Sequence, residues 1–323
     1  MNLKNLLPPR TLAEDSTGMA EYLKKYGIFI AFIFICIILT VATPNFLTVQ
    51  NMVMVLRQIS INGILAIGVT FVIISGGIDL SLGSVVALAG VAAASFAHQG
   101  TYGLWVPLLV GLLIGLTIGT VNGLIITKGK VAAFIVTLGM MTIARGLALV
   151  VSNGRPISNL SDSFNYIGGG EFLNIPIPIL LFGAVILISS TILKYTKTGR
   201  YIYAVGGNEN AAKASGINVN SIKLFSYIIC SGLAGLAGIV LASRITTGQP
   251  NAGVAYELDA IAAVVIGGTS LSGGSGKIIG TVVGALIIGV INNGLDLLNI
   301  TSYSQQIIKG LIIVGAVLLD RRN

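Results

Sequence analysis

Ten long apolar segments, separated by short polar ones, constrain this chain more than any other feature of its sequence. A helix that crosses a hydrocarbon core of about 30 Å needs about 20 residues. Backbone groups at that depth must hydrogen-bond within their own segment, which favours helices, and the sequence lacks the alternating strands of a barrel. It therefore predicts an all-α polytopic membrane protein with about ten transmembrane helices. Their expected ranges are 27–43, 52–75, 83–97, 104–126, 131–151, 175–193, 224–245, 257–268, 278–298 and 303–319.

The composition excludes the other classes of protein. Of 323 residues, 54% are hydrophobic and only 9% are charged, against about 25% charged in an average soluble domain. A soluble globule cannot bury that much apolar side chain, and disordered chains are polar and charge-rich. Two cysteines cannot build a disulfide scaffold. The third and eighth segments are short and flanked by glycine, so we expect either to be a broken or partly inserted helix.

The positive charges indicate the orientation. If the amino terminus is cytoplasmic, most of the 19 basic residues fall on the inner side, in segments 1–26, 76–82, 127–130, 194–223, 269–277 and 320–323. The positive-inside rule therefore predicts that both termini are cytoplasmic. The net charge of +8 then reflects topology, and no nucleic-acid partner is needed to explain it. We expect a cytoplasmic segment over 1–26, one transmembrane domain over 27–320 and a cytoplasmic tail over 321–323.

The sequence carries a weak internal duplication. Segment 76–84 resembles 267–275, Asn122-Gly123-Leu124 returns as 293–295, and Gly139 pairs with Gly310. Duplicated halves are typical of transporters, in which the solute path lies between the repeats. The glycine-rich segments 76–84 and 267–275 are six predicted helices apart, which predicts parallel halves. A count wrong by one helix would make the halves inverted, so both arrangements stay open.

Glycines recur at helical spacing within three of the apolar segments. Small residues at this spacing let helix backbones approach closely in lipid. We therefore expect close packing at Gly111, Gly115, Gly119 and Gly123, at Gly280 and Gly284, and at Gly232, Gly235 and Gly238.

The longest polar segment, 194–223, contains the local signals of a short helix. Asn208 suits an N-cap, Glu209 complements the helix dipole and Gly216 suits the left-handed C′ position. The face is mostly alanine, which suits insertion into a groove on another protein. We interpret it as a docking helix for a cytoplasmic motor subunit, with an ordinary amphipathic linker as the alternative.

Motifs for chemistry are missing from the sequence. Gly276-Lys277 resembles a phosphate-binding loop, but Ile278 replaces the Ser or Thr and Leu271 replaces the first glycine. A single histidine, His98, excludes a histidine metal site, and we expect Cys36 and Cys230 to be structural. The chain is therefore predicted not to be an enzyme, with no catalytic, nucleotide or metal site. Any energy from ATP must come from a partner.

Several charged residues fall at or inside the predicted spans, where an ionised group costs on the order of 3 kcal/mol. Asp79 is expected at the cytoplasmic rim, and Glu257 and Asp259 at the outer start of the eighth segment, each as a helix cap or a functional group. Lys309 is the costliest basic group, and we expect it to pair with Asp296.

The segment from Tyr256 to Gly274 resembles the signature of monosaccharide permeases of ATP-binding-cassette (ABC) importers, in their superfamily with branched-chain amino acid permeases. Further matches are 76–81, 206–209, 215–217 and 292–295, and the likeness runs from about residue 27 to 320. Ribose-type members are the most similar. Asp296 departs from the pattern, in which asparagine is expected.

The resemblance implies a permease domain over 27–320 in a bacterial cytoplasmic membrane, moving a monosaccharide of the ribose type by alternating access. It implies four partners: a second permease copy, a cytoplasmic ATPase that binds ATP and Mg, an extracytoplasmic sugar-binding protein, and membrane lipid. No cofactor is expected in this chain. The resemblance also assigns the coupling helix to Asn208, Glu209, Asn210, Ala211, Ala212, Lys213, Ala214, Ser215 and Gly216.

Neutral sugars need hydrogen-bonding partners without strong charge. Candidate wall groups of the path are Gln58, Asn62, Asn122, Asn292 and Asn293, although each could instead satisfy a backbone or bridge two helices. The main alternative function is an ion-coupled secondary transporter that uses Asp79 or Asp296. A membrane-embedded enzyme and a passive channel are weaker alternatives.

Overall fold

The computed structural model describes residues 12–320, with side chains for 27–301, 303–312, 314 and 315. The first eleven residues of the predicted segment 1–26 and the predicted tail 321–323 lie outside the described residues. All ten predicted apolar segments form helices. They are α1 (Leu12–Ala42), α2 (Val49–Ile74), α3 (Leu82–Ser95), α4 (Trp105–Thr127), α5 (Ala133–Val151), α7 (Ile177–Tyr195), α10 (Val219–Arg244), α11 (Tyr256–Ile266), α12 (Ile278–Leu297) and α13 (Ser302–Asp320).

Six of these helices are long and apolar enough to cross a membrane, namely α2, α4, α5, α7, α10 and α12. The count of about ten full spans is therefore not confirmed. Helix α3 has 14 residues and α11 has 11, so they reach only about 21 Å and 16 Å at 1.5 Å per residue. The expectation that the third and eighth segments are broken helices agrees with these lengths.

Helices α2–α5 and α10–α13 form two sets with the same pattern of neighbours. Helix α3 packs against α4, α5 and α10, whereas α11 packs against α12, α13 and α2. In addition, α4 packs along α10, and α12 packs along α2. Each of these contacts in one set has an equivalent in the other. The equivalent helices are α2 and α10, α3 and α11, α4 and α12, and α5 and α13. The duplication seen weakly in the sequence is thus a structural repeat.

The two halves of the repeat are inverted, not parallel. Helix α4 is antiparallel to α10, α12 is antiparallel to α2, and α2 is antiparallel to α10, so α4 and α12 run in opposite directions. The close approaches that establish these directions are Gly111–Ile239, Gly123–Leu224, Thr281–Thr70, Asn293–Asn51, Gly68–Cys230 and Gly77–Tyr227.

The two sequence echoes differ in their structural meaning. Asn122 and Asn293 lie on the equivalent helices α4 and α12. The glycine-rich segments 76–84 and 267–275 do not occupy equivalent places. They lie side by side instead, where the Gly274 amide donates to the carbonyl of Ile74 at 2.9 Å. The sequence predicted parallel halves because these two glycine-rich segments were taken as repeats of each other, whereas they are in contact.

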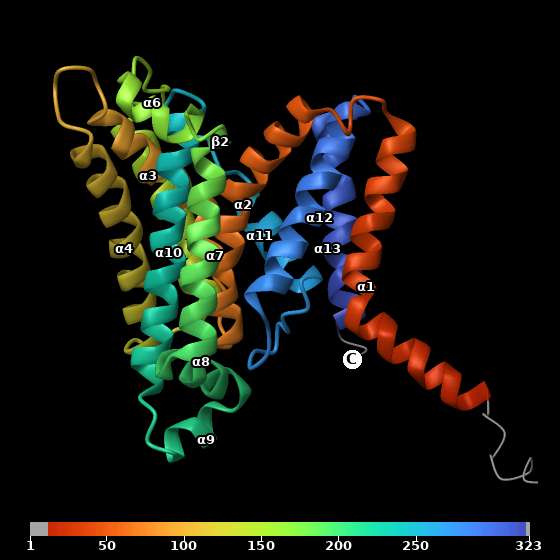
Figure 1. The fold of residues 1–323 in the computed structure, drawn as a ribbon. Helices are drawn as coiled ribbons and strands as arrows, with labels where there is room; N and C mark the ends of the chain where they lie inside the picture. Colours follow the sequence, from red (N-terminus) through yellow and green to blue (C-terminus); the bar gives the residue numbers. More distant parts are fainter. Residues whose placement is uncertain (1–11, 321–323) are drawn as a thin grey trace, which may run out of the picture.

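Five smaller elements lie at the ends of the bundle. Helices α8 (Lys197–Gly207) and α9 (Glu209–Ala214) lie at the same end as the start of α1 and the last described residues of α13 (Figure 1). We call this end the α9 end. Helix α6 (Asp162–Gly169) and the antiparallel pair β1 (Glu171–Phe172) and β2 (Ile175–Pro176) lie at the opposite end. The sequence predicted α9 alone among these elements.

Glycines allow the close contacts between helices, as predicted. A Cβ on Gly115 or Gly119 would collide with the carbonyl oxygens of Ser231 and Tyr227 on α10. On α12, a Cβ on Gly284 would collide with the carbonyl of Ala263 on α11. These backbones touch because no side chain separates them.

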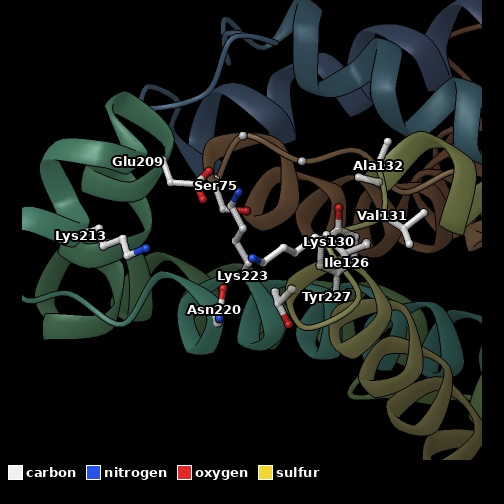
Figure 2. A pocket seen from close by; sticks show the side chains of 14 residues that line it. Ser75, Ile126, Lys130, Val131, Ala132, Glu209, Lys213, Asn220, Lys223 and Tyr227 are labelled. Carbon is white, nitrogen blue, oxygen red and sulfur yellow. Dashed lines mark hydrogen bonds and ion pairs between the residues drawn. The ribbon is translucent and has the colours of Figure 1, made fainter.

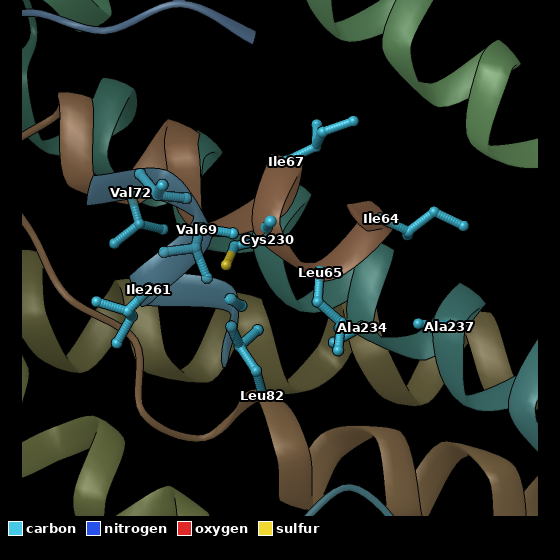
Figure 3. Close-up of a cluster of buried hydrophobic side chains, with 14 of the residues drawn as sticks. Ile64, Leu65, Ile67, Val69, Val72, Leu82, Cys230, Ala234, Ala237 and Ile261 are labelled. Atoms are coloured by element: carbon cyan, nitrogen blue, oxygen red, sulfur yellow. The ribbon is translucent and has the colours of Figure 1, made fainter. Parts of the chain in front are cut away.

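The apolar core lies where α2 and α10 cross the short helices α3 and α11. Figure 3 shows Val69, Leu82, Cys230 and Ile261 converging there from these four helices. Cys230 is fully buried and unpaired, and Cys36 is half-buried and unpaired. Both therefore act as small apolar groups in the described structure.

Candidate functional site

Helix α9 forms with the caps that the sequence predicted. The Asn208 side-chain oxygen accepts a hydrogen bond from the amide of Ala211 at 2.9 Å. Gly216 has a φ of +82°, the left-handed conformation that ends the helix. A helix of six residues is marginal alone, so its packing against the rest of the chain matters.

Two contacts fix α9 to the bundle. Lys223 on α10 donates to Glu209 Oε2 at 2.6 Å, and Ala212 is only 4% exposed. The alanine face that the sequence predicted is therefore partly buried in this chain and partly exposed. Ala212 packs against this chain and is not available to a partner, whereas Asn210, Ala211 and Ala214 are exposed. Only the exposed residues can enter a groove on another protein.

Helix α8 lies between α9 and the loop that joins α11 to α12. The Tyr203 hydroxyl donates to the carbonyl of Gly276 at 2.8 Å. Burial raises the pKa of the Tyr203 phenol, so it stays protonated and remains a donor at neutral pH. Gly206 lies directly on the carbonyl of Ile74, where a Cβ would not fit. Movement of α9 would therefore pass through α8 to the ends of α2 and α12.

A cavity of about 540 Å³ lies beside α9 (Figure 2). Its wall combines the ends of α2 and α4, the α4–α5 linker, α9 and the start of α10. The lysines Lys130, Lys213 and Lys223 line it together with one acid, Glu209, which already pairs with Lys223. The cavity is therefore basic and lies between α9 and the ends of α2 and α4. The lining residues are Ser75, Gly76, Gly77, Ile126, Thr127, Lys130, Val131, Ala132, Ala133, Glu209, Lys213, Asn220, Lys223 and Tyr227.

Three of the five predicted path residues are engaged in helix packing. Asn293 and Asn51 exchange amide hydrogen bonds of 2.8 and 3.0 Å, and Asn122 donates to Ser81 at 3.2 Å. Asn292 donates to Asp259 at 3.5 Å. All three side chains are at most 6% exposed, so they join helices and do not form an open wall.

The other two predicted path residues, Gln58 and Asn62, are half-buried on one face of α2. Their spacing of four residues places them together on that face. They remain candidates for the path.

The sequence predicted Asp79 at the cytoplasmic rim, and the structure shows that this is wrong. It is fully buried beneath the end of α2, where Oδ1 accepts from the Ser81 amide at 2.9 Å and from the Ser81 hydroxyl at 2.6 Å. Ser231 on α10 lies 3.4 Å from Oδ2. These bonds tie the segment before α3 to α10, but Asp79 does not cap α3, because Ser81 is the N-cap residue and no side chain caps the first turn.

Lys309 pairs with Asp259, and the expected pair with Asp296 is wrong. Lys309 Nζ lies 2.9 Å from Asp259 Oδ2. Asp296 lies at the exposed end of α12 and accepts from the side chain of Gln305 at 2.8 Å. The sequence placed Lys309 near Asp296 by chain proximity, but the inverted repeat brings the start of α11 to α13 instead.

The short helices α3 and α11 meet at their amino-terminal ends. The segment before α11 is irregular, with a left-handed φ of +70° at Gly253. Glu257, in the first turn of α11, lies against Gly83 in the first turn of α3. The carboxylate therefore lies at the positive ends of both helices.

Arg145 is the functional candidate that sequence reasoning missed. Its Nη1 atom donates to the carbonyl oxygens of Pro250 at 2.6 Å and Ala252 at 2.7 Å. It thereby holds the irregular segment that leads into α11, close to Glu257. An arginine within the apolar run 131–151 was the available signal, because a charge at that depth needs a specific partner. Among residues 12–320, no group of three or more His, Cys, Asp and Glu could hold a metal ion.

The chain matches the family described as "Branched-chain amino acid transport system / permease component" over residues 51–317. It is 50% identical to the ribose import permease protein of Haemophilus influenzae, over 94% of each chain. It is 48% identical to the ribose import permease protein of Bacillus subtilis, over 93% of this chain and 94% of the relative. The L-arabinose transport system permease protein of Escherichia coli is 41% identical over 95% of this chain and 94% of that one. No solved structure matches the chain.

Proposed function

Because this chain belongs to the family of branched-chain amino acid transport system permease components, we propose that it is the membrane subunit of an ATP-driven importer that carries ribose into a bacterial cell. The chain is not an enzyme and provides the gated path through the inner membrane. The observation that carries the choice of sugar is the 50% identity with a ribose import permease along 94% of both chains.

Helix α9 is the docking element for the ATPase. It is exposed, capped at both ends and joined through α8 to the ends of α2 and α12. The α9 end then faces the cytoplasm, with both termini, and ATP with its Mg is bound by the partner. The opposite end, with α6 and the β1–β2 pair, faces the extracytoplasmic sugar-binding protein.

A second copy of the permease completes the path. Lys309 keeps 26% of its side chain exposed in this single chain, although it lies within the predicted apolar segment 303–319. A charge at that depth faces water or protein and not lipid. Covering by a second copy satisfies this requirement, and alternating access then opens the space between the copies to each side in turn.

Reconstitution tests this function. Vesicles that contain the permease, its ATPase and the binding protein should accumulate labelled ribose only when ATP is supplied. Accumulation that persists without ATP and stops with an ionophore would instead support the ion-coupled transporter. Uphill transport by the isolated chain would contradict the proposal, because this subunit has no energy source of its own.

The structure does not favour the ion-coupled alternative at the two carboxylates suggested for it. Asp296 is exposed beyond the end of the membrane core, and both oxygens of Asp79 are used by Ser81 and Ser231. Neither offers an open site for a coupling ion within the described residues.

A further inference from the structure

Of the partly exposed charged side chains in the described residues, three lie on the apolar helices α5, α11 and α13. They are Arg145 on α5, Glu257 at the start of α11 and Lys309 on α13. At 1.5 Å per residue, Arg145 lies about 18 Å from the start of α5 and Glu257 lies about 14 Å from the end of α11. Both positions fall near the middle of a hydrocarbon core about 30 Å thick. Arg145 holds the segment that leads to Glu257, so the face that these two side chains share is made by α5 and the start of α11.

This face cannot be a lipid-facing surface, because charges at mid-depth face water or a protein partner. From it we infer that the transported sugar passes over this face and that Arg145 and Glu257 bind its hydroxyl groups. The inference rests on the proposed function and adds the residues that contact the solute. Arg145 and Glu257 thus take the place of Asn122, Asn292 and Asn293 as candidate path residues, because those asparagines are engaged in helix packing.

The hydrogen-bonding capacity of the two side chains fits a neutral sugar. Arg145 uses Nη1 for its two carbonyl partners, and within the described residues its Nε and Nη2 atoms have no acceptor. Glu257 supplies carboxylate oxygens beside it. A sugar hydroxyl both donates and accepts, so it can bind the guanidinium and the carboxylate together. Their charges cancel, so the pair offers strong hydrogen bonds without a net charge.

Two neutral residues close in sequence to Glu257 and Arg145 report on the surroundings of this face. Leu258 on α11 is 45% exposed, and Thr142 on α5 is exposed. Leu187 on α7 is 71% exposed at a similar depth, but α7 has no charged residue near it at this level, so it serves as a lipid-facing reference.

The test is cysteine labelling in the complete importer. Cys36 and Cys230 are first replaced by alanine, and Leu258→Cys, Thr142→Cys or Leu187→Cys is then introduced. A membrane-impermeant methanethiosulfonate should modify the cysteines at 258 and 142 at least about tenfold faster than the one at 187, because the reactive thiolate forms in water. Ribose with its binding protein and ATP should slow modification at 258 and 142 only.

A charge-neutral variant gives a second readout. Glu257→Gln keeps the size of the side chain and should lower ribose uptake about tenfold, equivalent to about 1.4 kcal/mol. The amide still packs against Gly83, so the thermal midpoint of the complex should fall only slightly, through the charge lost at the two helix ends. A merely structural role for Glu257 would lower the thermal midpoint much further and leave the labelling of Leu258→Cys insensitive to ribose.

The outcomes separate this inference from the proposed function. If the unaltered importer fails to take up ribose with ATP, the proposed function is wrong. If it takes up ribose but the cysteines at 258 and 142 react as slowly as the one at 187, or react without protection by ribose, the sugar does not pass over this face.

Discussion

Gly83 and Gly253 touch backbone to backbone at the point where the two broken helices meet. A Cβ on Gly83 would collide with the carbonyl oxygen of Gly253, and a Cβ on Gly253 would collide with that of Gly83. The inverted halves of the protein therefore join through a contact that only glycine permits on both sides.

Replacing Gly83 by alanine should destabilise the protein. The added methyl group has backbone on one side and Glu257 on the other, so we expect a loss of about 1–3 kcal/mol from overpacking. The thermal midpoint of the detergent-solubilised protein measures it. Gly146→Ala is the matched control, because a Cβ there meets nothing within 4 Å. Equal midpoints for the two variants would show that the junction can relax.

The α4–α10 interface should fail when its glycines are filled. Gly115→Leu places a side chain where the carbonyl of Ser231 and the backbone of Gly235 already lie, so α4 must move away from α10. We expect lower stability in detergent, measured by size-exclusion chromatography after heating. Gly183→Leu on α7, where a Cβ has no neighbour within 4 Å, should behave as the unaltered protein. Unchanged stability of Gly115→Leu would refute close packing as the role of this glycine.

Docking of the ATPase should depend on the exposed face of α9 and not on Ala212. Ala211→Arg with Ala214→Arg adds bulk and charge at exposed positions, and should abolish co-purification of the ATPase and ribose uptake without lowering stability. Ala204→Arg, exposed on α8, is the control. The substitution Ala212→Asp buries a carboxylate in this chain, so a loss of uptake there would not identify the docking surface. Normal assembly of the double variant would contradict the assignment.

The cap of α9 should matter more than the same cap on a long helix. Asn208→Ala removes the bond to Ala211 and should cost about 1 kcal/mol, which is large for a helix of six residues. Asn218→Ala removes the equivalent bond at the start of α10, but packing holds that helix of 26 residues. Ribose uptake should therefore fall in the first variant, recover with Asn208→Asp, and change little in the second. Equal uptake by both would mean that the cap does not limit coupling.

The pair between Lys309 and Asp259 should be essential to stability, and Asp296 should not. Lys309→Met leaves the carboxylate of Asp259 unpaired at 6% exposure, which should cost about 3–5 kcal/mol. Adding Asp259→Asn should restore most of that loss, as a double-mutant cycle on thermal stability would measure. Asp296→Asn, at an exposed site, should change stability by no more than about 0.5 kcal/mol. A larger loss of stability in Asp296→Asn than in Lys309→Met would instead support a pair between Lys309 and Asp296.

Local signals predicted the elements that depend on them. The caps of α9 are within a few residues of the helix that they end, so Asn208 and Gly216 were identified correctly. Helix α8 was missed although Thr196 caps its start, and it is held by a contact from Tyr203 to Gly276 far along the chain. The five path residues were chosen by side-chain chemistry alone, which cannot distinguish an amide in a wall from one between two helices.

The sequence by itself determined that the chain is helical, spans a membrane and carries a short capped helix in its longest polar segment, because hydropathy, glycine spacing and capping act within one segment. Only the tertiary structure decided that the halves are inverted, that Lys309 pairs with Asp259, and that Arg145 holds the segment before α11. These relations join residues from 50 to more than 100 positions apart. Their geometry depends on how helices pack against one another, and segment-by-segment reading carries no information about that.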